Sequence, residues 1–116
     1  MDLARFAAAA GELLDSLGDR FPPPARESVH TYLWTGEEGL AADELAGVLD
    51  RYRVPVSPRE RDLLRELLYA FDVEDGAGAP SHYRWLNDRA RVLEGLNVVN
   101  DPPAPSPSPP PRSPDR

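Results

Sequence analysis

The sequence predicts an all-α protein, a small bundle of four to five helices followed by a disordered, Pro-rich C-terminal tail. Apolar residues recur at spacings of three and four in several segments, which is the pattern of amphipathic helices. No alternation of period two extends beyond a few residues of the sequence. Half of the last sixteen residues are proline, a composition that does not bury a core. We therefore expect one domain at residues 1–97 and a tail at residues 98–116.

The N-terminal part of the chain is predicted to contain two helices. The first is expected over residues 2–17, where the initial aspartate can act as N-cap and Gly18 can end the helix. The prolines of residues 21–24 predict a stiff, extended connector. A second helix is then expected from about residue 25 to residue 35, before Gly36.

The most strongly patterned segment is residues 37–71, which predicts two helices joined by a tight turn. Ser57 can N-cap the second helix, Pro58 suits its first position, and Glu60 can complete a capping box. Pro55 lacks a backbone donor and helps to end the helix before it. The expected apolar stripes are Leu40, Ala41, Leu45, Val48, Leu49 and Tyr52, and then Leu63, Leu64, Leu67, Leu68 and Phe71. The expected helices cover residues 37 or 38–53, 58–71 and, capped by Ser81, about 81–95.

The composition describes an acidic protein without disulfide bonds. The chain carries a net charge of −7, from 20 acidic residues against 13 basic ones, all of them arginine, and it has no cysteine. An acidic surface repels a phosphate backbone, so direct nucleic-acid binding is not expected; it suits a basic protein partner or serves solubility alone. No cationic segment precedes an apolar run, and no apolar run is long enough for a membrane span. We expect a cytoplasmic protein.

Residue patterns that would carry catalysis or metal binding are weak. Gly76 and Gly78 do not follow a predicted strand, so they do not form a phosphate-binding loop. His30 and His82 have no partner at metal-ligand spacing. Residues 72–76 resemble the start of a calcium loop but lack its closing glutamate. We therefore expect no enzyme activity and no metal or cofactor.

The outer faces of the two central helices supply the candidate partner-binding residues. Residues 37–50 contain five acids and no base, and the small pair Ala46 and Gly47 is expected on the solvent side, open to close approach by a partner. Tyr69 is expected to be outside, and tyrosine is favoured at interface hot spots. The alternatives are a Tyr69 ring folded back onto another helix and acids on an ordinary solvated surface. The predicted contact residues are Glu37, Glu38, Asp43, Asp50, Asp62, Glu66 and Tyr69.

Part of the chain resembles a known family. Residues 33–45 (LWTGEEGLAADEL), residues 54–60 (VPVSPRE) and the leucine-rich helix ending at Phe71 resemble the MafI-type immunity proteins of bacterial polymorphic toxin systems. That family shows a Glu-x-Gly-Leu-Ala-x-x-x-Leu helix and a Val/Ile-Pro-Ile-Ser turn, and the resemblance covers roughly residues 30–75. It implies binding and neutralisation of a cognate toxin, often a nuclease, encoded by a neighbouring gene. No contact residue carries over.

We therefore expect a toxin-neutralising immunity protein that acts by occlusion through an acidic helical surface, with a basic toxin domain as partner. The alternative is a helical adaptor or regulatory module with another protein partner. A DNA-binding helix-turn-helix regulator is disfavoured, because the arginines at 59, 61 and 65 are matched by Glu60, Asp62 and Glu66. The tail with Arg112 has the composition of a ligand for an aromatic-lined peptide groove, although such tails are more often dispensable ends.

Overall fold

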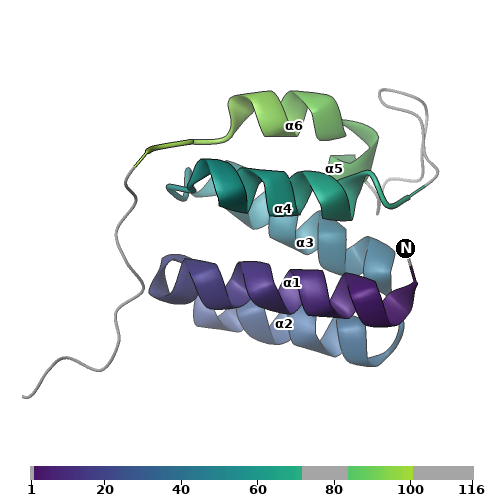
Figure 1. The fold of residues 1–116 in the computed structure, drawn as a ribbon. Helices are drawn as coiled ribbons and strands as arrows, with labels where there is room; N and C mark the ends of the chain where they lie inside the picture. The colour runs from purple at the N-terminus through teal and green to yellow at the C-terminus, as the bar shows by residue number, and fades with distance from the viewer. Residues whose placement is uncertain (1, 72–83, 101–116) are drawn as a thin grey trace, which may run out of the picture.

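Six α-helices and one 3-10 turn form the described part of the chain, which in this computed structural model comprises residues 2–71 and 84–100 (Figure 1). The elements are α1 (Leu3–Leu17), η1 (Gly18–Arg20), α2 (Pro23–Trp34), α3 (Glu38–Arg51), α4 (Pro58–Leu68), α5 (Arg84–Asn87) and α6 (Arg89–Gly95). The predicted all-α class is confirmed. The last expected helix is divided at Asp88, and its expected cap Ser81 lies outside the described residues.

Consecutive long helices run in opposite directions, because short connections join them (Figure 1). As a result, the ends of α2 and α4 lie at the same end of the bundle as the beginnings of α1 and α3. We call this the Tyr69 end, after the residue that follows α4. Helix α3 is central and packs against α1, α2, α4, α5 and α6.

The predicted caps form as expected from the local sequence. Asp2 accepts a hydrogen bond from the Arg5 backbone N–H (2.8 Å), and Gly18, with φ +54°, ends α1. At the start of α4, the Ser57 hydroxyl accepts from the Glu60 N–H (3.0 Å), and the Glu60 carboxylate accepts from the Ser57 N–H (2.8 Å). This reciprocal capping box satisfies two of the N–H groups left over at a helix start.

Several helix boundaries differ from the prediction. The connector expected at residues 21–24 is shorter, because Pro22 is the N-cap of α2 and the next two prolines occupy its first turn, where a missing N–H costs nothing. Helix α3 ends at Arg51 rather than 53, and α4 at Leu68 rather than 71. Tyr52 therefore leaves the apolar stripe and is exposed, because Arg53 with φ +51° turns the chain away.

The core lies between α1, α2, α3 and α4 and continues under α5 and α6. Leucine supplies most of it, in keeping with the apolar stripes of the sequence. The largest side chains with almost no exposed surface are Phe21, Leu13, Leu14, Leu17, Leu45, Leu49, Leu64, Leu67, Leu68, Leu86, Val29 and Val56. Phe6 of α1 meets Phe71 edge to face, with ring centroids 5.4 Å apart.

A buried charged pair, Arg20 and Glu60, joins η1 to the first turn of α4. Nη1 and Nη2 of Arg20 donate to the Glu60 carboxylate (2.9 and 2.7 Å), and Arg20 also donates to the carbonyls of Ser16 and Pro55. Burial by itself raises the pKa of the Glu60 carboxyl. Hydrogen bonds from Arg20, Ser16 and the Ser57 backbone, together with the Arg20 charge, lower the pKa below its ordinary value.

The segment after α6 is bonded to the turn before α4. Val56 donates to the Asn97 carbonyl (3.0 Å) and accepts from the Val99 N–H (2.8 Å), forming an isolated parallel bridge with Val98. The expected tail boundary before residue 98 thus falls inside a paired segment. Residues 101–116, for which the sequence predicts disorder, lie outside the described residues. Within the described ranges, no helix combines the length and apolar character that crossing a membrane requires.

Candidate protein-binding site

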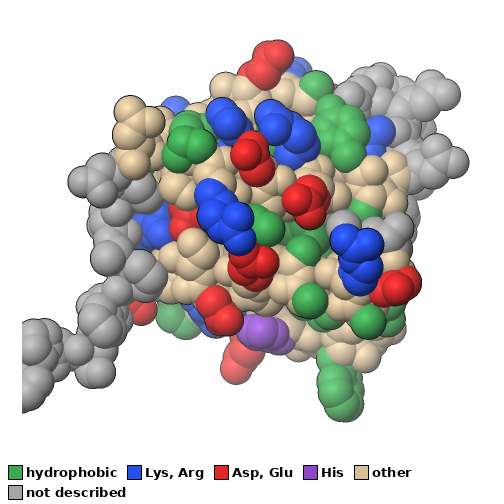
Figure 2. Space-filling model, in the orientation of Figure 1, with side chains coloured by type: hydrophobic (Ala, Val, Ile, Leu, Met, Phe, Trp, Pro, Cys, Tyr) green, Lys and Arg blue, Asp and Glu red, His purple; other side chains and the backbone are tan. Residues whose placement is uncertain are grey.

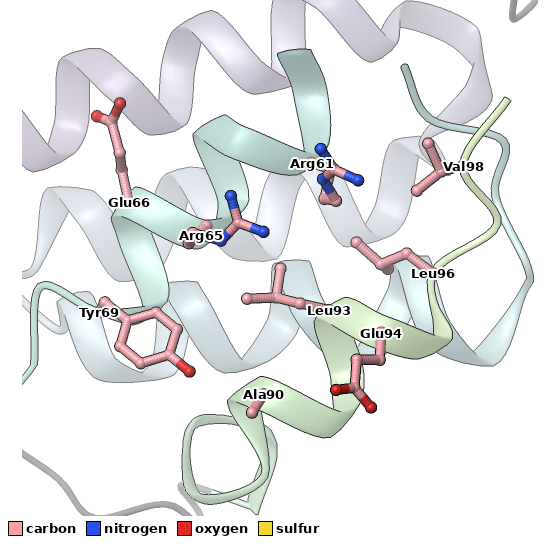
Figure 3. Close-up of a pocket in the computed structure, with 9 residues that line it drawn as sticks. All are labelled: Arg61, Arg65, Glu66, Tyr69, Ala90, Leu93, Glu94, Leu96 and Val98. Carbon is pink, nitrogen blue, oxygen red and sulfur yellow. The ribbon is translucent and has the colours of Figure 1, made fainter. Parts of the chain in front are cut away.

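A groove runs between α4 and α6 and encloses about 860 Å³ (Figure 3). We call it the α4–α6 groove. Its apolar floor is formed by Leu93 and Leu96, which are almost fully buried, with Ala90 and Val98 beside them. Charged side chains and one tyrosine complete the lining: Arg61, Arg65, Glu66, Tyr69 and Glu94. An apolar centre with a polar rim is the composition of a protein interface.

Arg89 fixes α6 against the C-terminal end of α4. One of its guanidinium nitrogens, Nη1, donates to the carbonyl of Leu68 (2.9 Å), which the end of α4 leaves without an intrahelical donor, and to the carbonyl of Phe71 (3.0 Å) just beyond the helix. The Arg89 guanidinium also lies over the Tyr69 ring, 4.1 Å from its centroid. A cation at a helix C-terminus is further favoured by the helix dipole. Both walls of the groove are therefore held at a defined spacing.

The charges on the rim of the groove are mixed rather than uniformly acidic. Asp62 accepts from Arg65 (3.0 Å) and lies 3.4 Å from an Arg61 nitrogen. Figure 2 shows acidic and basic side chains interspersed over the face that α1, α4 and α6 present. Exposed pairs of this kind contribute little to folding, about 0–1 kcal/mol each. They leave charged groups at the surface that a partner can engage.

Three of the predicted contact residues lie on α4 and at its C-cap. Asp62 and Glu66 are exposed, and Tyr69 keeps 45% of its surface accessible at the end of the groove. Tyr69 thus combines the two alternatives considered from the sequence, because its ring contacts Arg89 of α6 while 45% of the residue stays accessible. Figure 3 shows its ring beside the α6 helix.

The prediction that Asp43 belongs to an exposed acidic face is wrong. Asp43 is buried, and its Oδ1 accepts hydrogen bonds from the backbone N–H groups of Trp85 (2.9 Å) and Leu86 (3.0 Å). It therefore satisfies the first N–H groups of α5. The small residues Ala46 and Gly47 are buried as well, since Trp85 packs on Gly47. The small residues do allow close approach, as predicted, but the segment that approaches is α5 of the same chain and not a partner protein.

The remaining predicted residues lie apart from the groove. Asp50 is half-buried and lines a smaller depression of about 550 Å³ together with Trp85 and Arg91. Glu37 precedes α3 and is exposed, and Glu38 is half-buried at its first turn. The seven predicted residues therefore do not form one surface, because α3 is enclosed on several sides instead of presenting a free outer face.

Sequence reasoning did not find the groove itself. Leu96 and Val98 carry no periodic signal in the sequence, and the arginines at 61 and 65 were considered only for their charge balance with neighbouring acids. The lining combines two segments that are close only after α6 has packed on α4. Within residues 2–71 and 84–100, no three His, Asp or Glu side chains cluster closely enough to hold a metal ion.

Comparison with known proteins adds no further constraint on this site. No protein-family model matches the chain, and neither curated proteins nor solved structures show a significant match.

Proposed function

We propose that the protein is an immunity protein that binds a cognate toxin domain through the α4–α6 groove and blocks that domain by occlusion. The observation that carries the proposal is the groove itself, with an apolar floor, a partly exposed aromatic at one end and a charged rim. The resemblance of residues 30–75 to MafI-type immunity proteins supports the choice of a toxin domain as partner. The net charge of −7 supports a basic one.

Tyr69 is the expected anchor of this interface. Its ring is already held in place by Arg89, so that little conformational entropy remains to be lost when a partner covers the accessible part of the side chain. Tyrosine at the edge of a desolvated apolar floor has the composition of a hot spot, for which truncation to alanine costs at least about 2 kcal/mol of binding. This corresponds to a roughly 30-fold weaker affinity.

The chain offers a matched control in Tyr52. Both tyrosines are C-cap residues of a helix, both are exposed, and both lie under an arginine guanidinium, at 5.8 Å for Tyr52. Tyr52 follows α3, whose end lies opposite the Tyr69 end, and it does not line the groove. Tyr52→Ala should therefore leave binding unchanged.

The test is binding of the full chain to the toxin domain encoded by the neighbouring gene, with co-expression in cells as a protection assay. Wild type is expected to bind and to protect. Tyr69→Ala is expected to dissociate about 30-fold faster, while melting curves report any loosening of α6. Glu66→Arg is expected to slow association with a basic domain, more strongly at low salt.

Two results would reject the proposal in different ways. No binding and no protection by wild type would reject the immunity function and favour an adaptor with another partner. Equal kinetics for wild type, Tyr69→Ala and Glu66→Arg would retain the function and remove the groove as its surface.

A further inference from the structure

Trp34 is the most exposed large apolar side chain in the described part of the protein. Its accessible fraction is 89%, against 60% for Tyr52 and 45% for Tyr69. It is the last residue of α2, and the residues one and two turns before it, His30 and Glu27, are exposed as well. Tryptophan is highly buried on average in folded proteins, so this side chain contributes almost no burial to folding.

The corner that carries Trp34 is rigid. The Gly36 N–H donates to the Leu33 carbonyl (3.2 Å), and the Glu37 N–H donates to the Tyr32 carbonyl (2.7 Å). With φ +77° at Gly36, these two bonds form a Schellman motif. The Thr35 hydroxyl donates to the carbonyl one turn back, at 3.0 Å. The backbone that presents the indole is therefore ordered before any partner binds, which lowers the entropic cost of binding.

The sequence around this corner is acidic. Glu37 and Glu38 follow Trp34 within four residues, and no arginine occurs between Arg26 and Arg51. An indole face attracts cations, most often an arginine guanidinium, and a nearby carboxylate adds an ion pair to the same group. The exposed indole and the carboxylates are thus complementary to a basic side chain and not to an acidic one.

We propose that Trp34 and Glu37 bind an arginine of the toxin domain, whose guanidinium stacks on the indole face and pairs with the carboxylate. This inference rests on the proposed function and specifies the partner's chemistry. Trp34, at the end of α2, and Tyr69, just beyond α4, both lie at the Tyr69 end of the bundle (Figure 1).

The test compares two substitutions at Trp34 in the full chain, by calorimetric binding to the neighbouring toxin domain. Trp34→Phe keeps an aromatic face, whereas Trp34→Leu keeps only apolar area. We expect the Kd to rise about 30-fold for Trp34→Leu and no more than about fivefold for Trp34→Phe. Glu37→Gln should weaken binding, and the effect should shrink as salt is raised. The control Tyr52→Leu should leave the Kd unchanged.

Each outcome decides the inference. If Trp34→Leu binds the toxin domain as tightly as wild type does, the proposed arginine contact is overturned while the immunity function stands. If Trp34→Leu and Trp34→Phe lose the same amount of affinity, the indole is used in another way than arginine stacking. If wild type fails to bind, both proposals fall. Sedimentation of the isolated protein tests whether a second copy of the chain covers Trp34. A dimer that forms in wild type and is lost in Trp34→Leu would overturn the arginine contact in favour of self-association.

Discussion

For Gly47→Ala, helix propensity predicts a more stable protein, whereas the packing around the residue predicts a less stable one. In a helix interior, alanine is more stable than glycine by about 1 kcal/mol. At Gly47, however, an added Cβ would lie 2.5 Å from Nε1, 2.9 Å from Cδ1 and 3.0 Å from Cε2 of Trp85. Real Cβ atoms do not approach ring atoms so closely, so either α5 or the indole must move.

The displacement is costly because Trp85 is anchored. Its backbone N–H and that of Leu86 donate to Asp43 Oδ1 at 2.9 and 3.0 Å, which fixes α5 against α3. Overpacking costs about 1–3 kcal/mol, and contact with three ring atoms favours the upper end of that range. After subtraction of the propensity gain of about 1 kcal/mol, the expected net loss is about 2 kcal/mol. For a domain of this size it lowers the melting temperature by roughly 10 °C.

Urea unfolding of Gly47→Ala, Gly11→Ala and the double variant Gly47→Ala with Trp85→Ala measures the effect. Gly11 lies in α1 with nothing within 4 Å of an added Cβ, so Gly11→Ala should gain about 0.5–1 kcal/mol. In the Trp85→Ala background, Gly47→Ala should stabilise in the same way, because the clashing ring is absent. If Gly47→Ala stabilised the wild-type background as much as Gly11→Ala does, the packing of α5 on α3 would be refuted.

Three further outcomes are expected from the buried groups. Asp43→Ala should lower the free energy of unfolding by about 2–4 kcal/mol, because two N–H groups lose their acceptor. Hydrogen exchange should also show that the backbone amides of α5 lose protection, and unchanged protection would contradict this prediction. Leu67→Ala should cost about 2–5 kcal/mol in urea unfolding, since the side chain is fully buried; a neutral result would remove Leu67 from the core. Because folding lowers the Glu60 pKa, its contribution to stability is present above about pH 4.3 and is lost as the pH falls through the lower folded-state value. Glu60→Gln should remove that acid-dependent part of the unfolding free energy, and an acid limb identical to that of wild type would argue against the Arg20 pairing.

Features set by neighbouring residues could be predicted from the sequence. The N-cap Asp2, the terminator Gly18 and the Ser57–Glu60 capping box each involve groups within three or four residues of one another. Helical periodicity also identified buried positions such as Leu67. These interactions form whenever the local backbone is helical, so no knowledge of the packing was needed.

Features set by distant residues required the tertiary structure. Arg20 meets Glu60 across 40 positions, and Asp43 caps a helix that begins 41 residues later. Periodicity assigned Asp43 and Gly47 to the outside because it identifies one apolar face per helix. Helix α3 is enclosed on several sides, so a small residue and a carboxylate on its polar face serve close packing and capping. Which face of a helix meets solvent depends on how many neighbours surround it, and only the packed bundle decides that number.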